Sequence, residues 1–158
     1  FRALFKHLFR LIDSNNMEKA AGFVIFRRLC GEIQYLLLKA SYGSFHWSSP
    51  KGHVDPGEDD FTTALRETKE EAGYDEKDLI IYKDTPLTLN YQVQDKPKIV
   101  IYWLAELRNP CQEPILSEEH TDLKWLPKEE AKQCVGFKDN QVMIDKFHQM
   151  ILDQNKPM

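Results

Sequence analysis

Two stretches of sequence decide the fold, GHVDPGE at residues 52–58 and RETKEEAGY at residues 66–74. The glycines and the proline of the first stretch predict a loop. Asp59 or Asp60 then caps a helix whose apolar positions recur at helical spacing, and Gly73 ends that helix. The sequence therefore predicts a loop, a helix and a sharp stop in direct succession.

Three glutamates of this helix, Glu67, Glu70 and Glu71, are spaced i, i+3 and i+4, so their carboxylates converge. We expect them on the face beside the apolar stripe, which consists of Phe61, Ala64, Leu65, Thr68 and Ala72. Like charges at this spacing cost roughly a few tenths of a kcal/mol per pair, and only Arg66, Lys69 and solvent lie nearby in sequence to offset them. A solvated acidic face is the plain alternative, but the clustering favours a bound cation.

The residue types near this helix indicate which cation is expected. Oxygen ligands with no nearby cysteine, and with no histidine on the same helix face, suit a hard divalent ion rather than zinc. The sequence therefore predicts Mg2+, with Mn2+ as a substitute, and such ions favour phosphate substrates.

The spacing Gly-x5-Glu-x7-Arg-Glu-U-x-Glu-Glu-x-Gly-U, where U is a bulky aliphatic residue, is the Nudix box. The sequence resembles this box at every fixed position and departs from it at the two loose apolar sites, which hold Thr68 and Tyr74. The resemblance implies the Nudix fold, of class α/β (α+β), with a mixed β-sheet sandwiched between helices. It also implies hydrolysis of a nucleoside diphosphate linked to another group.

Flanking segments narrow the resemblance, which runs from Ala20 to Phe137. They are similar to those of the animal asymmetrical bis(5'-nucleosyl)-tetraphosphatases, and they comprise HWSSPKGH at 46–53, LNY at 89–91, KPK at 96–98, YWLA at 102–105 and LSEEH at 116–120. The resemblance implies metal-dependent hydrolysis of diadenosine tetraphosphate, a small dinucleoside polyphosphate, to ATP and AMP.

The same resemblance implies a ligand set. Glu67, Glu70 and Glu71 would ligate the metal, Gly52 would offer its carbonyl, and Glu119 would add a distal carboxylate. Where that family tends to have His-Glu-His, this chain has Glu118-Glu119-His120, which places an extra acid beside the expected ligand. The general base stays open among Glu70, Glu71 and Glu119. We expect Arg66 to orient Glu58 or Glu67 rather than to contact substrate.

Five further residues are implied for substrate binding. Lys51, Lys98 and His46 would neutralise the polyphosphate, and Tyr91 and Phe137 would supply flat faces on which a purine stacks, each stack contributing about 1 to 3 kcal/mol. Each has a plain alternative: Tyr91 and Phe137 as core aromatics, and His46 and Lys51 as solvated loop residues.

Length and composition restrict the class of protein. A chain of 158 residues with 42% hydrophobic residues is enough for one domain, expected over residues 17–158. The net charge of −4 disfavours long nucleic acid as a partner. Three scattered cysteines indicate a reducing compartment, the cytoplasm, and no membrane segment is predicted. We expect a monomer.

Residues 1–16 form a separate problem, because their apolar residues follow helical spacing with basic residues between them. The pattern predicts a basic amphipathic helix. It fits upstream or cloning-derived sequence, a targeting peptide that would make the protein mitochondrial, or a helix that packs on this domain or a partner. Met17 is a candidate natural start.

Hydrophobic patterning predicts the order β-β-α-β-β-β-β-α-α over residues 19–154. The strands are expected at 22–27, 35–38, 79–82, 87–93, 99–107 and 123–126, and the last two helices after Pro127 and at 139–152. Pro86 and Pro97 are expected to separate strands.

Two rival functions stay open. The first is another Nudix reaction, on the 5' pyrophosphate of RNA or on nucleotide sugars. The second is a catalytically silent nucleotide-binding module that keeps the fold, against which the intact Glu67, Glu70 and Glu71 argue.

Overall fold

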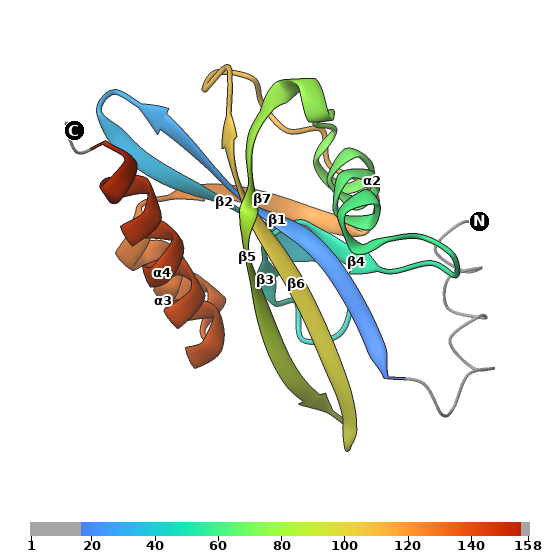
Figure 1. The fold of residues 1–158 in the computed structure, drawn as a ribbon. Coiled ribbons are helices and arrows are strands. Elements are labelled where there is room, and N and C mark those ends of the chain that lie inside the picture. The colour runs from blue at the N-terminus through green and yellow to red at the C-terminus, as the bar shows by residue number, and fades with distance from the viewer. Residues whose placement is uncertain (1–16, 156–158) are drawn as a thin grey trace.

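The computed structural model describes residues 17–155, so the helix predicted for residues 1–16 lies outside the described residues. A mixed sheet separates helix α2 on one face from helices α3 and α4 on the other (Figure 1). This layered arrangement is the one implied by the Nudix resemblance, and the prediction of the fold class is confirmed.

The elements occur in the order β1 (Glu18–Leu29), β2 (Glu32–Ala40), β3 (Trp47–Ser48), β4 (Lys51–His53), α2 (Asp60–Ala72), the 3-10 turn η1 (Glu76–Asp78), β5 (Leu79–Val93), β6 (Lys96–Leu107), β7 (His120–Leu126), α3 (Lys128–Val135) and α4 (Lys138–Gln154). The sheet has the order β3-β2-β1-β6-β5, with β4 pairing to β1 and β7 pairing to β2. Strands β1 and β6 run parallel, and the other pairs are antiparallel.

Two cores form because successive side chains of a strand point to opposite faces of the sheet. Phe23 and Ile25 of β1 pack on the α2 side, together with Ala64. Val24 and Phe26 pack on the other side, in the core to which α3 and α4 contribute. The central strand β1 is thereby buried on both faces, which explains its nearly continuous apolar sequence.

Strands β1 and β2 form the predicted hairpin. Cys30 and Gly31 of its turn both have positive φ, 51° and 79°, as a two-residue turn of this kind requires. The short strands β3 and β4 were not predicted, because two or three residues carry no readable periodicity.

The predicted break between strands 79–82 and 87–93 is wrong, because β5 runs from Leu79 to Val93. Its pairing with β6 shifts register between Tyr82 and Leu87, where Pro86 lies. Strand β5 ends the sheet order, and proline is tolerated at irregularities of edge strands because the missing N–H breaks no regular ladder. Pro97 likewise lies within β6 instead of between strands.

The predicted boundaries of α2 are confirmed. Asp59 caps the helix, accepting a hydrogen bond from the Thr62 amide at 2.8 Å. Gly73 ends it with a φ of 74°, and its amide donates to the Lys69 carbonyl at 3.0 Å. The two C-terminal helices are also present where predicted. None of the helices within residues 17–155 has the length and apolar character needed to cross a membrane.

Candidate active site

Helix α2 turns two of the predicted ligands into the protein. Its buried residues are Thr63, Ala64, Glu67, Thr68, Glu71 and Ala72. Glu67 is 2% exposed and Glu71 is 6% exposed, so the helix face beside the apolar stripe, on which both were expected, is buried as well. Residues three and four positions apart share one helix face, and Glu67 and Glu71 are spaced in this way from Ala64 and Thr68. Glu70 lies at the margin of this face and is partly exposed.

Strand β4 contacts both buried acids. A Cβ atom at Gly52 would overlap the carboxylate group of Glu67, so this position has room only for glycine. The backbone amide of Lys51 donates to Oε2 of Glu71 at 3.0 Å. The loop glycine of the sequence motif therefore serves to let a carboxylate approach the strand.

Arg66 organises the acids at the start of the helix. Its Nε and Nη2 donate to the two carboxylate oxygens of Glu58, each at 2.9 Å, and Nη2 also donates to the His53 carbonyl at 3.0 Å. Its Nη1 lies 2.8 Å from Oε1 of Glu67 and 3.5 Å from Oε1 of Glu70. The hydrogen bonds from Arg66 lower the pKa of Glu58 to about 2. Arg66 thus binds protein acceptors, chiefly Glu58 and Glu67.

Glu71 has the opposite electrostatic environment. Burial raises its pKa above the ordinary value of a glutamate, and the negative charges of Glu67 and Glu119 raise it further. The hydrogen bond from the Lys51 amide acts against this rise. The positive charge of Lys51 also acts against it. The protein therefore buries a carboxylate whose charge is incompletely compensated.

A divalent cation fits this pair of acids by its chemistry. Carboxylate oxygens are the ligands that hard divalent ions prefer, and a cation would offset the repulsion between Glu67 and Glu71. In the described part of the chain, however, no three His, Cys, Asp or Glu side chains are gathered closely enough to ligate one ion. Glu67 and Glu71 are therefore the core of the candidate metal site.

Three predicted phosphate-binding residues meet beside the acids. Lys51 begins β4, Lys98 lies in β6, and His46 directly precedes β3. Burial lowers the pKa of His46, and the charges of Lys51 and Lys98 lower it further, so both lysines lie within electrostatic range of His46. We call Lys51, Lys98 and His46 the cationic patch, after the charges of its two lysines. It adjoins the acid pair through Lys51, whose amide contacts Glu71.

His120 belongs to the same region, although the sequence analysis assigned it no role. Burial, together with the charges of Lys51 and His46, lowers its pKa to about 4. Its Nδ1 is buried and has no hydrogen-bond partner within the described residues. Its neighbour Glu119 acts electrostatically on Glu71. The one available sequence signal was the position of His120 next to Glu119.

Tyr91 and Phe137 lie at one end of α4. Tyr91 pairs with Lys98 across β5 and β6, and its hydroxyl donates to Oδ1 of Asn140 in the first turn of α4 at 3.2 Å. Phe137 immediately precedes that turn and is 62% exposed, which excludes core packing for its ring. Tyr91 packs partly against the core. A hollow of about 280 Å³ lies between β5 and α4, but neither Tyr91 nor Phe137 lines it.

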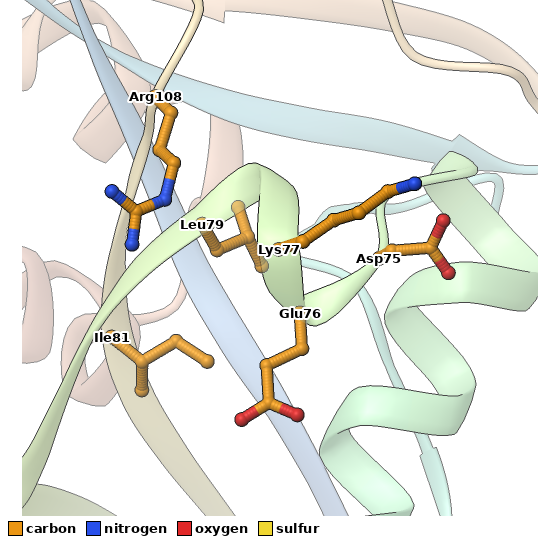
Figure 2. A pocket seen from close by; sticks show the side chains of 6 residues that line it. All are labelled: Asp75, Glu76, Lys77, Leu79, Ile81 and Arg108. Atoms are coloured by element: carbon orange, nitrogen blue, oxygen red, sulfur yellow. The ribbon is translucent and has the colours of Figure 1, made fainter.

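A larger hollow of about 820 Å³, open to solvent, lies near the C-terminal end of α2 (Figure 2). Its lining comes from η1, the start of β5 and the end of β6, and consists of Asp75, Glu76, Lys77, Leu79, Ile81 and Arg108. None of the six lining residues is a predicted site residue. The larger hollow is therefore not the candidate active site. The buried acids and the cationic patch mark that candidate site.

Comparison with known proteins agrees with this geometry. The family model for the NUDIX domain matches residues 18–147, which include α2, β4 and all of the acids described above. The chain belongs to the Nudix family.

Nudix relatives of high similarity carry one name. The bis(5'-nucleosyl)-tetraphosphatase [asymmetrical] of Caenorhabditis elegans is 49% identical over 129 residues, covering 82% of this chain and 93% of the relative. The protein of the same name from Sus scrofa is 47% identical over 139 residues, covering 84% and 95%. A crystal structure of a C. elegans Ap4A hydrolase binary complex superposes with a TM-score of 0.84 at 46% identity, covering 87% of this chain and 99% of that one.

The two departures from the Nudix box have different structural outcomes. Thr68 is buried, and its hydroxyl has no partner within the described residues, so it fills an aliphatic position mainly by its size. Tyr74 is also buried, but its hydroxyl donates to the backbone carbonyl of Gln112 at 2.6 Å. An aliphatic residue at the second Nudix position could not make this bond.

Proposed function

We propose that this chain hydrolyses diadenosine 5',5'''-P1,P4-tetraphosphate asymmetrically to ATP and AMP, with Mg2+ as the metal. The observation that carries the proposal is the contact between two opposite charge clusters. The buried acids Glu67 and Glu71 adjoin the cationic patch through β4. A dinucleoside polyphosphate needs both, because its phosphates carry several negative charges. The names of the Nudix relatives support this substrate.

Different residues of the chain have different roles in the proposed reaction. Use of a divalent cation is a property of the Nudix family, and a cation held by Glu67 and Glu71 would lower the pKa of a water and neutralise phosphate charge. Lys51 and Lys98 hold phosphate oxygens, and His46, whose lowered pKa keeps the ring neutral near pH 7, serves as a hydrogen-bonding group.

Purine recognition is assigned to Tyr91 and Phe137. The hydrogen bond from Tyr91 to Asn140 fixes its ring beside the first turn of α4, while the exposed ring of Phe137 offers a face for stacking. Lys98 is the register partner of Tyr91, so a purine on this platform has its first phosphates next to a cation. This arrangement orients the substrate relative to the acid pair.

The proton of the attacking water goes to one of Glu70, Glu71 or Glu119. Glu71 is the most buried of the three, and Glu70 and Glu119 lie at the margin of the site. Replacing each in turn with glutamine and recording the pH dependence of the rate distinguishes them. Replacement of the base removes the acidic limb of the profile, whereas replacement of a ligand alters the metal requirement.

The proposal also covers the cellular compartment, the extent of the catalytic domain and the oligomeric state. Cys30, Cys111 and Cys134 are all free thiols, which is suited to the reducing cytoplasm. If residues 1–16 are a targeting sequence, the protein acts in the mitochondrial matrix and not in the cytoplasm. We further propose that residues 17–158 form the catalytic domain and act as a monomer.

Product labelling tests the reaction. In 18O-labelled water with Mg2+, attack at the fourth phosphorus puts the label in AMP, and label found only in ATP would reject this regiochemistry. A panel at fixed metal concentration should include diadenosine tetraphosphate, RNA with a 5' pyrophosphate and nucleotide sugars. Faster turnover of either rival substrate contradicts the proposal, and tight binding of the dinucleotide without turnover supports a silent binding module.

A further inference from the structure

The segment between β6 and β7, residues 108–119, carries Glu119 back toward α2. We call this segment the Glu119 loop. It is attached at its far end to β2, because the Ser41 amide donates to the Glu119 carbonyl at 2.9 Å. Its first half is attached to the sheet by Arg27, whose Nη1 donates to the Pro110 carbonyl at 3.2 Å. The placement of Glu119 therefore depends on contacts made by the rest of the loop.

The middle of the Glu119 loop is fastened to the end of α2. The Ile115 amide donates to the Ala72 carbonyl at 2.8 Å, and the Ile115 side chain lies against Gly73. One residue further along the chain, Tyr74 is buried and donates its hydroxyl to the Gln112 carbonyl at 2.6 Å. Burial raises the pKa of Tyr74, so the hydroxyl keeps its proton and remains a donor.

These contacts join two parts of the candidate metal site. Helix α2 carries Glu67 and Glu71, and the loop carries Glu119, which is near enough to act on the charge of Glu71. The Tyr74 hydroxyl and the Ile115 amide both cross from the end of this helix to this loop. An aliphatic residue, as in the Nudix box, could fill the space of the ring but could not bond the carbonyl.

We propose that Tyr74 is a positioning residue that clamps the Glu119 loop to the end of α2 and so sets Glu119 relative to Glu71. The inference rests on the proposed function in one respect, the role of Glu119 as a distal metal ligand. Partners that orient metal ligands without touching the metal typically contribute about 10- to 100-fold to metal affinity. Tyr74 makes a single backbone contact at a distance from the metal site, so its contribution to metal affinity should lie near the lower limit of this range.

Tyr74→Phe removes the hydroxyl and keeps the ring, so it is the direct test. Tyr35→Phe is a matched control, because Tyr35 is also buried and its hydroxyl also makes a 2.8 Å hydrogen bond, to Nδ1 of His148 in the other core. Mn2+ binding is measured by calorimetric titration without substrate. We expect Tyr74→Phe to weaken binding about tenfold and Tyr35→Phe to leave it unchanged.

A double-mutant cycle shows whether Tyr74 acts through Glu119. Glu119→Gln alone should weaken Mn2+ binding, and adding Tyr74→Phe to it should cause little further loss. Hydrogen exchange should also be faster at the Ile115 and Glu119 amides in Tyr74→Phe and unchanged there in Tyr35→Phe. If Tyr74→Phe does not melt cooperatively, Tyr74→Leu, which restores the Nudix pattern, is measured in the same way.

The outcomes separate the two proposals. Wild-type Mn2+ affinity in Tyr74→Phe, an equal loss in Tyr35→Phe, or full additivity with Glu119→Gln overturns the clamp and leaves the proposed function intact. If Glu119→Gln binds Mn2+ like the wild type, Glu119 is not a ligand and the clamp is overturned together with that part of the proposed site. If the wild type does not bind Mn2+ at all, the proposed function itself fails.

Discussion

Two largely buried glutamates, one at the start of α2 and one in its second half, have opposite electrostatic environments. At the start, Glu58 accepts two hydrogen bonds from Arg66, and these lower its pKa to about 2. In the second half, burial and the charges of Glu67 and Glu119 raise the pKa of Glu71, and the amide and the charge of Lys51 act against this rise. A paired carboxylate stabilises the fold, whereas an incompletely compensated one costs stability.

The difference teaches where to look for chemistry in this molecule. Acids were equally conspicuous in both regions of the sequence, but the structure pairs one with an arginine and leaves the charge of the other incompletely compensated. Strongly perturbed carboxylates in a partly open site are candidates for function, while fully paired ones usually are not. The first three of the four predictions that follow test this division, because each changes one region and leaves the other as it is.

The largest effect is expected from Glu71→Gln, which keeps the shape of the side chain and removes its charge. Turnover of diadenosine tetraphosphate should fall by about a thousandfold or more because the metal loses a ligand. Folding should be intact or improved, because a buried charge is gone. Rate measurements and thermal melts check both, with Glu130→Gln on the exposed side of α3 as control. An unaltered rate would end the assignment of Glu71.

The next effect concerns Glu58 and is an effect on stability. Its folded-state pKa is about 2 and its ordinary value is 4.5, so its contribution is fully present above pH 4.5 and is lost as the pH falls through 2. The difference corresponds to about 3 kcal/mol at neutral pH.

Urea unfolding of Glu58→Gln and the wild type measures this contribution. The difference in free energy of unfolding should be largest near pH 7 and should shrink steadily between pH 4.5 and pH 2. A difference that does not depend on pH would show that the Glu58–Arg66 pair stabilises the fold by packing and not by charge.

A smaller effect is expected from Gly52→Ala, which connects strand β4 to the second region. The new Cβ would overlap the Glu67 carboxylate, so the fold should lose about 1 to 3 kcal/mol as the side chain is displaced. Shortening the displaced side chain in Gly52→Ala/Glu67→Asp should restore part of the stability and none of the activity. Equal recovery of both would mean that the position of Glu67 does not matter for catalysis.

The smallest effect is expected from Phe137→Ala, outside both regions. Loss of one stacking face should raise KM for diadenosine tetraphosphate about tenfold with little change in kcat, because stacking contributes about 1 to 3 kcal/mol. The exposed ring makes little contribution to folding, so the melting temperature should be nearly constant. A drop in kcat with KM unchanged would remove Phe137 from purine recognition.

Much of the fold was predictable from local signals. The caps at Asp59 and Gly73 define α2, and two short apolar runs separated by Cys30-Gly31-Glu32 indicate the neighbouring strands β1 and β2. The predictions of secondary structure failed where the local sequence signal is weak or where the tertiary structure overrides it. Strands β3 and β4 are too short to show a period, and Pro86 looks like a break until the edge position of β5 is known.

The candidate site was predictable in its residue types and less so in its arrangement. The spacing of Glu67, Glu70 and Glu71 indicated a metal site, and that role stays a prediction. The burial of Glu67 and Glu71 was not predicted, because apolar residues alone were used to find the buried part of the helix. His120 was assigned no chemical role, because it lies near Lys51 and His46 only through the pairing of β7 with β2.

The sequence by itself determined the helix, its ends and the spacing of the carboxylates, because these depend on residues within a few positions of one another. The tertiary structure alone decided which carboxylates are paired and which are left poised. Arg66 reaches Glu58 within the same segment, but the environment of Glu71 is made by β4 and the Glu119 loop. Burial and Coulomb energy depend on distance in space, which the chain specifies only once it has folded.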